Sequence, residues 1–271
     1  MLVGVVLVIQ GLTAAKLPAR WRFALWWLVL IRLVLPFGPG SRWSLFNLTP
    51  LQAPAVSVTP LVGTALAVVW AAGILGVVGR IVWENQRLAF AVVRRRSVTD
   101  AAVLDVLEDC RALMRIHTPV AIVETPHVSS PALHGFIRPR LLVPPGLLRT
   151  FSREELRFVI LHELAHLQRH DIAVGWLLAA LQALHWFNPV IWVAFLRMRA
   201  DRELAADELA LWYAKPTENR AYAETIIKLL ETCSGRLTVP TLVGILEDRS
   251  HMTRRIRRGG VKTETGGADA L

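Results

Sequence analysis

Apolar residues form long runs near the start of the chain and periodic patterns after residue 96. The runs 2–17, 21–37 and 58–80 carry few charges, and we expect each to form a membrane-spanning helix. From Thr99 to Ile116, apolar positions recur every three to four residues, which predicts an amphipathic helix. Three short apolar runs that follow, at 119–124, 133–137 and 141–143, predict strands.

This order of elements predicts three parts. Residues 1–96 would form an α-helical membrane anchor, residues 97–262 a small, mostly α domain with a short β-sheet, and residues 263–271 a flexible tail. The chain is 54% hydrophobic and its mean hydropathy is +0.43, which is too apolar for an ordinary soluble domain. Composition therefore supports a multi-pass protein in contact with a lipid bilayer.

Basic residues predict how the anchor is oriented. Lys16, Arg20 and Arg22 lie at or near the junction of the first two runs, and three arginines at 94–96 follow the third, whereas the loop at 38–60 carries a single arginine. Because positive loops stay inside, we expect the N-terminus outside and the domain on the cytoplasmic side of the membrane. Anionic lipid then accounts for the net charge of +10, and direct binding of nucleic acid is not expected, because no binding motif accompanies the charge.

The strongest chemical motif is His-Glu-Leu-Ala-His at residues 162–166. On a helix, His162 and His166 lie one turn apart on one face, so both imidazoles can reach one metal ion. Glu163 is placed to take a proton from the attacking water. Ser152 and Glu155 form a capping-box pair that predicts where this helix starts. The alternative is a buried amphipathic helix that carries two histidines by chance.

A catalytic zinc needs a third protein ligand. His170 continues the four-residue spacing, but it lies about 12 Å from His162 along a straight helix, which is too far for one ion. Glu203 is the better candidate, and Asp207, one turn later, would accept a hydrogen bond from a ligating histidine. On spacing alone, a solvated charged helix face explains Glu203 and Asp207 equally well.

The apolar segment 172–200 decides whether Glu203 can reach the histidines. A single crossing of the membrane would place Glu203 on the wrong side. Asn188 and Pro189 interrupt the segment, and proline breaks a helix. The two arms would then measure about 24 and 21 Å, which returns the chain to its starting side. We therefore predict a membrane-associated helical hairpin, in which His185 and Asn188 form hydrogen bonds with backbone groups freed at its tip.

The segment 133–211 resembles the membrane zinc metallopeptidases of the BlaR/MecR type, the β-lactam sensor and antirepressor proteases. The matching stretches are His134–Pro139, His162–His166, Arg169–Asp171, His185–Pro189 and Asp201–Asp207. The resemblance implies a small gluzincin-like zincin domain on a membrane anchor, with zinc held by His162, His166 and Glu203 and with Glu163 as the catalytic base. It further implies cleavage of a cytoplasmic protein, often a transcriptional repressor, after an extracellular signal.

The chain departs from these relatives after Glu203. The residues that follow contain no clear membrane span and no second globular domain, so we expect no extracellular sensor domain here. The signal would then come from a separate sensor subunit, or the chain would act as a truncated or stand-alone protease. Small residues at four-residue spacing in the third apolar run also allow a homodimer.

Substrate contacts are expected near the second predicted strand. His134, Gly135 and Phe136 lie on a candidate edge to which an extended substrate could add. His134 is also a candidate for stabilising the oxyanion, as are Tyr213 and Tyr222. A structural role for a strand histidine remains the alternative.

Three classes of function fit this pattern. The first is a membrane-embedded zinc endopeptidase that cleaves a cytoplasmic regulator in signal transduction. The second is a quality-control or processing protease similar to the CAAX-processing and heat-shock zincins. The third is a membrane scaffold with a structural metal, although structural zinc sites are closed by four ligands and this chain offers three beside Glu163.

Overall fold

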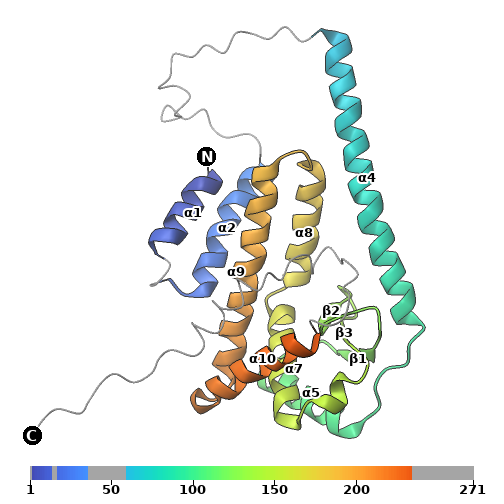
Figure 1. Cartoon of the computed structure of the whole chain (residues 1–271), viewed down its shortest axis with the longest axis vertical. Helices are drawn as coiled ribbons and strands as arrows, with labels where there is room; N and C mark the ends of the chain where they lie inside the picture. Colours follow the sequence, from blue (N-terminus) through green and yellow to red (C-terminus); the bar gives the residue numbers. More distant parts are fainter. Residues whose placement is uncertain (1, 14–16, 36–58, 234–271) are drawn as a thin grey trace, which may run out of the picture.

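A computed structural model describes residues 2–13, 17–35 and 59–233, which form a set of helices with one small sheet at its side (Figure 1). The predicted tail at 263–271 and the last part of the predicted domain, 234–262, lie outside the described residues.

The first three helices are α1 (Leu2–Leu12), α2 (Ala19–Val34) and α4 (Pro60–Val93). Among the described residues, only α4 is long and apolar enough to cross a membrane by length and composition. Helices α1 and α2 have 11 and 16 residues, short of the about 20 that a span needs. Three spans therefore stay a prediction.

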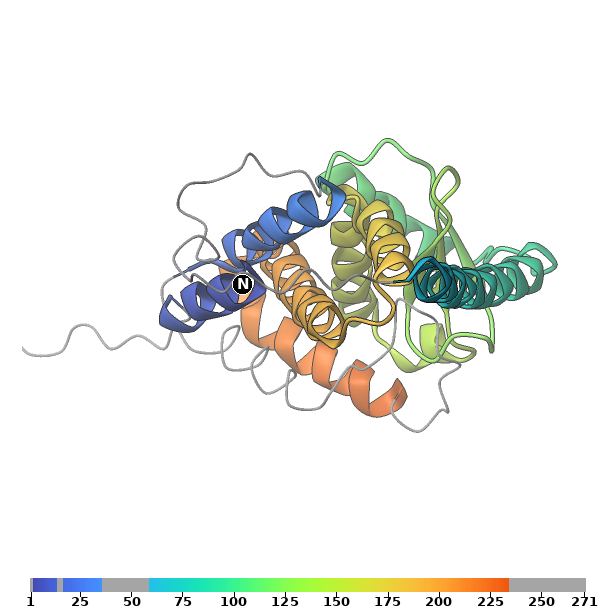
Figure 2. The same cartoon turned by 90° about the horizontal axis from the view of Figure 1, so that it is seen from above.

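Helix α4 is longer than the predicted run 58–80, because it continues to Val93. Residues 80–93 contain neither proline nor glycine, and the Arg80 guanidinium lies 3.4 Å from Glu84 one turn later. Arg80 and Arg87, at and beyond the end of the predicted run, thus lie within the helix. Figure 2 shows α4 at the margin of the molecule, beside α8 and away from α1 and α2.

The segment after the metal motif folds into two antiparallel helices, α8 (Asp171–Leu184) and α9 (Pro189–Tyr213). A ring nitrogen of His185 lies 3.0 Å from a carbonyl oxygen of the preceding turn. The Asn188 side chain accepts a 3.0 Å hydrogen bond from the backbone N–H two residues later. Both residues at the tip therefore form hydrogen bonds with backbone groups, as expected. The hairpin packs against α1 and α2, and α9 runs well past the predicted end at residue 200.

The sheet contains β1 (Ala121–Glu124), β2 (Ala132–His134) and β3 (Arg140–Val143) in the order β1-β3-β2. Strand β3 is parallel to β1 and antiparallel to β2, so β2 lies at an edge. The predicted strand 133–137 is shorter than expected. Gly135 has a φ of +95°, and a Cβ there would lie 2.8 Å from the Arg138 carbonyl oxygen, so the chain turns after β2.

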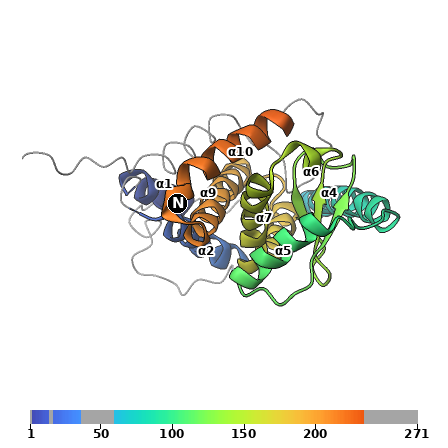
Figure 3. The same cartoon turned by 90° about the horizontal axis from the view of Figure 1, so that it is seen from below.

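The main core surrounds α7 (Arg153–Gln168) (Figure 3). Helices α5 (Ala101–Leu113) and α10 (Asn219–Cys233) pack on it, together with the sheet and the end of α9. Two short elements, α6 (Leu147–Thr150) and the 3-10 helix η1 (Pro216–Glu218), complete the order. Because α7 is covered on most sides, the side chains that it carries are held in fixed positions.

The predicted capping box starts α7. The Ser152 hydroxyl accepts a 3.2 Å hydrogen bond from the Glu155 N–H, and the Glu155 carboxylate accepts one of 2.7 Å from the Ser152 N–H. Glu155 also lies 2.8 Å from the Lys228 ammonium of α10. The start of α7 is therefore fixed both locally and by α10.

Candidate metal centre

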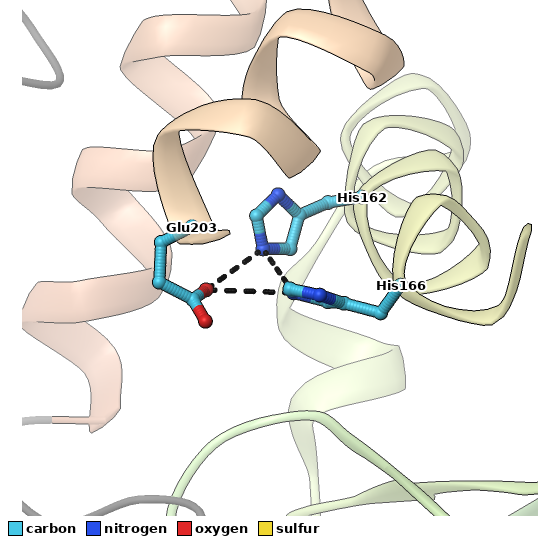
Figure 4. Close-up of side chains that lie close together, drawn as sticks. All are labelled: His162, His166 and Glu203. Atoms are coloured by element: carbon cyan, nitrogen blue, oxygen red, sulfur yellow. Dashed lines mark hydrogen bonds and ion pairs between the residues drawn. The ribbon is translucent and has the colours of Figure 1, made fainter. Parts of the chain in front are cut away.

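Two helices bring three predicted ligands together. His162 and His166 project from α7, and Glu203 faces them from α9 (Figure 4). The Glu203 Oε2 atom lies 3.7 Å from His162 Nε2 and 3.4 Å from His166 Nε2. The two Nε2 atoms are 3.3 Å apart, and one donor atom from each residue falls within a common 4.8 Å. Two imidazole nitrogens and one carboxylate oxygen are a donor set that suits zinc and leaves a fourth position open.

The electrostatics of this cluster favour positive charge. Burial opposes the charging of His166, but the facing carboxylate of Glu203 and the hydrogen bond to Asp171 raise its pKa to about 8. Both acidic side chains therefore stabilise a cation placed among the ring nitrogens. That preference is what a divalent metal site requires.

Each histidine has a carboxylate on its other ring nitrogen. His162 Nδ1 lies 3.0 Å from Asp207 Oδ1, and His166 Nδ1 lies 2.8 Å from Asp171 Oδ2. The Tyr222 hydroxyl donates a 2.8 Å hydrogen bond to Asp207 and lies 3.1 Å from His162 Nδ1. A carboxylate at Nδ1 keeps the proton there and leaves Nε2 free to bind a metal. Asp207 thus lies where its predicted role requires.

Sequence reasoning missed two contacts to the ligands. Asp171 is the first residue of α8, and a left-handed turn at His170, with a φ of 57°, brings it back to His166. Arg202 Nη2 lies 3.2 Å from Glu203 Oε1, which leaves Oε2 directed at the histidines. An acidic residue just after the end of a histidine-bearing helix was the available signal for Asp171. No comparable signal marked Arg202.

The two tyrosines do not fit an oxyanion role. The Tyr222 hydroxyl lies on the Nδ1 side of His162, away from the converging Nε2 atoms. The Tyr213 hydroxyl accepts a 3.1 Å hydrogen bond from Gln168 at the end of α7. Tyr222 is therefore placed to hold Asp207 and His162 in position instead.

The predicted substrate residues lie on and beyond β2, which packs against α7. His134 ends the strand, and burial together with the Arg140 charge lowers its pKa below the usual range. Gly135 turns the chain, and Phe136 and Ile137 are 66% and 86% exposed. An edge strand beside the histidine helix thus continues into an exposed apolar corner.

We expect Tyr222→Phe to weaken zinc binding about tenfold, because Asp207 loses the donor that fixes its position next to His162. Competition with a chromophoric chelator measures the effect. Tyr213→Phe is the matched control, because it removes a hydroxyl bonded to Gln168 rather than to the cluster. Equal zinc affinity in the two variants would show that Tyr222 does not support the site.

Comparisons with known proteins point to one family. A sequence model of the BlaR1 peptidase M56 family matches residues 50–258. The regulatory protein BlaR1 of Bacillus licheniformis is 24% identical over 200 residues, covering 74% of this chain and 33% of that protein. The methicillin resistance mecR1 protein of Staphylococcus aureus (strain Mu50 / ATCC 700699) is 25% identical over 138 residues, covering 51% of this chain and 24% of that protein. The chain therefore matches less than half the length of these relatives.

Proposed function

Because this chain belongs to the BlaR1 peptidase M56 family, we propose that it is a membrane-embedded zinc endopeptidase. Its ligands would be His162, His166 and Glu203. The observation that carries the proposal is the convergence of three donor atoms of the right kind from α7 and α9, with a carboxylate behind each histidine. Three ligands leave room for a substrate, whereas a structural zinc site is closed by four.

The residues around the cluster have separate roles in the proposed reaction. When bound, Zn²⁺ acts as a Lewis acid that polarises the scissile carbonyl and makes water a nucleophile at neutral pH. Glu163, which is 7% exposed beside His162, accepts a proton from the attacking water and delivers it to the leaving amine. Asp207 and Asp171 hold the histidine rings, and Arg202 holds the ligand carboxylate.

The proposed place for the substrate is the edge of β2 with which no described strand pairs. An extended peptide would add to β2 as a further strand, because β3 occupies only the other edge. Residues His134, Gly135 and Phe136 would contact it, and the exposed Phe136 and Ile137 favour apolar side chains there. His134 is the remaining oxyanion candidate in this arrangement.

The proposed substrate is a cytoplasmic protein, with a regulator such as a transcriptional repressor as the first choice. Helix α4 would anchor the enzyme in the inner membrane, with the N-terminus outside and the zinc domain on the cytoplasmic side. The Bacillus licheniformis relative is named a regulatory protein, which supports a signalling role. The signal would arrive through a separate sensor subunit or a homodimer.

We expect one new N-terminus in a cytoplasmic regulator when cells that carry the wild-type chain are compared with cells that carry Glu163→Ala. The Glu163→Ala protein retains the ligands and so controls for expression and membrane load. Mass spectrometry of protein N-termini makes the comparison. Many cuts in damaged membrane proteins would instead identify the quality-control alternative. Identical N-termini in the two strains would argue for the scaffold with a structural metal.

A further inference from the structure

Four polar or amphipathic side chains meet in a buried cluster between α1, α2 and α9. Gln10, Arg22, Trp26 and Asp201 are 6%, 9%, 1% and 4% exposed. Arg22 Nη2 lies 3.0 Å from Asp201 Oδ1, and Trp26 Nε1 donates a 2.8 Å hydrogen bond to Asp201 Oδ2. Gln10 Nε2 lies 3.0 Å from the same Oδ2 and 2.9 Å from the Arg22 carbonyl oxygen. We call these four residues the Asp201 cluster.

The Asp201 cluster lies directly behind a proposed ligand. Asp201 precedes Glu203 by two positions, a rotation of about 200° on a helix, so the two side chains leave α9 on nearly opposite sides. Asp201 meets α2, and Glu203 meets α7. Figure 3 shows α9 passing between α2 and α7. The bonds of Asp201 fix how α9 is rotated about its axis and how far it is shifted along it. The same rotation and shift therefore determine where the Glu203 carboxylate lies.

Apolar packing already holds α2 and α9 together. Trp26, Leu30, Phe195 and Met198 are each no more than 2% exposed in this interface. A buried ion pair adds little net stability, because its desolvation offsets most of its attraction. Directional bonds do, however, disfavour any slid or rotated arrangement that would leave the Asp201 charge unpaired. The physical role of the cluster is thus to favour one relative position of α2 and α9 over slid or rotated ones.

Helix α2 also reaches the histidine side of the site. Phe23, the residue after Arg22, lies with its ring centroid 4.8 Å from the Arg169 guanidinium carbon. Arg169 Nε lies 3.3 Å from Asp171 Oδ2, the atom that is 2.8 Å from His166 Nδ1. Two neighbouring residues of α2 therefore contact side chains near two different proposed ligands. Arg22 contacts Asp201, on the same helix as Glu203, and Phe23 contacts Arg169, beside Asp171 and His166.

We propose that Asp201 is a positioning residue for the metal centre, and that α2 sets the ligand geometry through Asp201 and Arg169. The proposal rests on the proposed zinc site. A displacement of α2, which precedes the candidate membrane helix, would then alter the distance between Glu203 and the histidines. Activity could be adjusted in this way without any contact between the signal and the substrate edge.

Two variants of the full chain test the proposal in lipid nanodiscs. Trp26→Phe removes one hydrogen bond to Asp201 and keeps an aromatic ring. The double variant Arg22→Met with Asp201→Leu replaces the ion pair with apolar groups and leaves no charge in the Asp201 cluster. Glu224→Ala is the control, because it breaks an ion pair whose side chains are 91% and 62% exposed. Zinc affinity and the visible spectrum of the Co²⁺-substituted protein are measured, and circular dichroism checks the fold.

We expect zinc affinity to fall about threefold in Trp26→Phe and about tenfold in the double variant. The cobalt bands should shift in both, while Glu224→Ala stays like the wild type. Folded variants with wild-type affinity and spectrum would overturn the proposal, and Trp26→Phe alone decides it if the double variant does not fold. A wild-type chain that binds no zinc would instead remove the proposed function, and this inference with it.

Discussion

The Glu163→Gln protein should bind zinc as the wild type does and lose its peptidase activity. The glutamine keeps the shape of the side chain but cannot accept a proton from water, and general-base catalysis contributes about 10²–10⁴-fold. Activity should therefore fall by at least about a hundredfold. Zinc content by elemental analysis and cleavage of the regulator found by N-terminal mapping are the two measurements.

Glu154→Gln is the matched control for this prediction. Glu154 lies on the same helix as Glu163 but is exposed to solvent. It should leave both zinc content and activity unchanged. Retained cleavage in the Glu163→Gln protein would contradict the mechanism, while simultaneous loss of zinc would mean that Glu163 supports the ligands rather than the reaction.

The second large effect is expected at Glu203. Glu203→Ala removes the proposed ligand on α9 and leaves two histidines on α7. Losing a side chain that hydrogen-bonds to a metal ligand already lowers metal affinity about 10–100-fold. Losing the ligand itself should therefore lower the affinity by more than about a hundredfold. Purified Glu203→Ala protein should contain little zinc, and its peptidase activity should disappear with the metal.

Glu231→Ala serves as the control, because Glu231 is exposed on α10, outside the cluster. Circular dichroism should show the same helix content in both variants. A Glu203→Ala protein that keeps stoichiometric zinc would place the third ligand elsewhere. The hairpin would then no longer be needed to complete the site.

Local sequence was sufficient for the parts of the site that lie on one helix. The spacing of His162 and His166 and the capping box at Ser152 depend on residues within one or two turns. Glu203 required a longer argument, in which the break at Pro189 returns the chain to its starting side. Each of these inferences uses only helix geometry and the effect of proline.

Contacts set by packing between distant helices were beyond the sequence. Asp201 meets Arg22 across 179 positions of sequence, and Phe23 meets Arg169 across 146. Neither pair has a spacing that marks it. These supports follow from how α2, α7 and α9 pack, which hydrophobic periodicity does not specify.

The apolar helices near the start of the chain were also only partly predictable from the sequence. Hydropathy found the apolar runs but not their helical lengths, so the run 2–17 corresponds to a helix that ends at Leu12. The run 58–80 corresponds to a helix that continues to Val93. Charged residues end an apolar run, but they have good helix propensity and so allow the helix to continue. Apolar composition thus predicts that these helices form better than it predicts where they end.

X-ray absorption at the zinc edge of the purified wild-type chain tests the central claim most directly. We expect one zinc per chain, bound by two imidazole nitrogens at about 2.0–2.1 Å and by oxygen donors at about 2.0–2.2 Å. The oxygen donors would be the Glu203 carboxylate and a solvent molecule or substrate. A sulfur neighbour at about 2.3 Å, four protein ligands, or a purified chain without zinc would contradict the account.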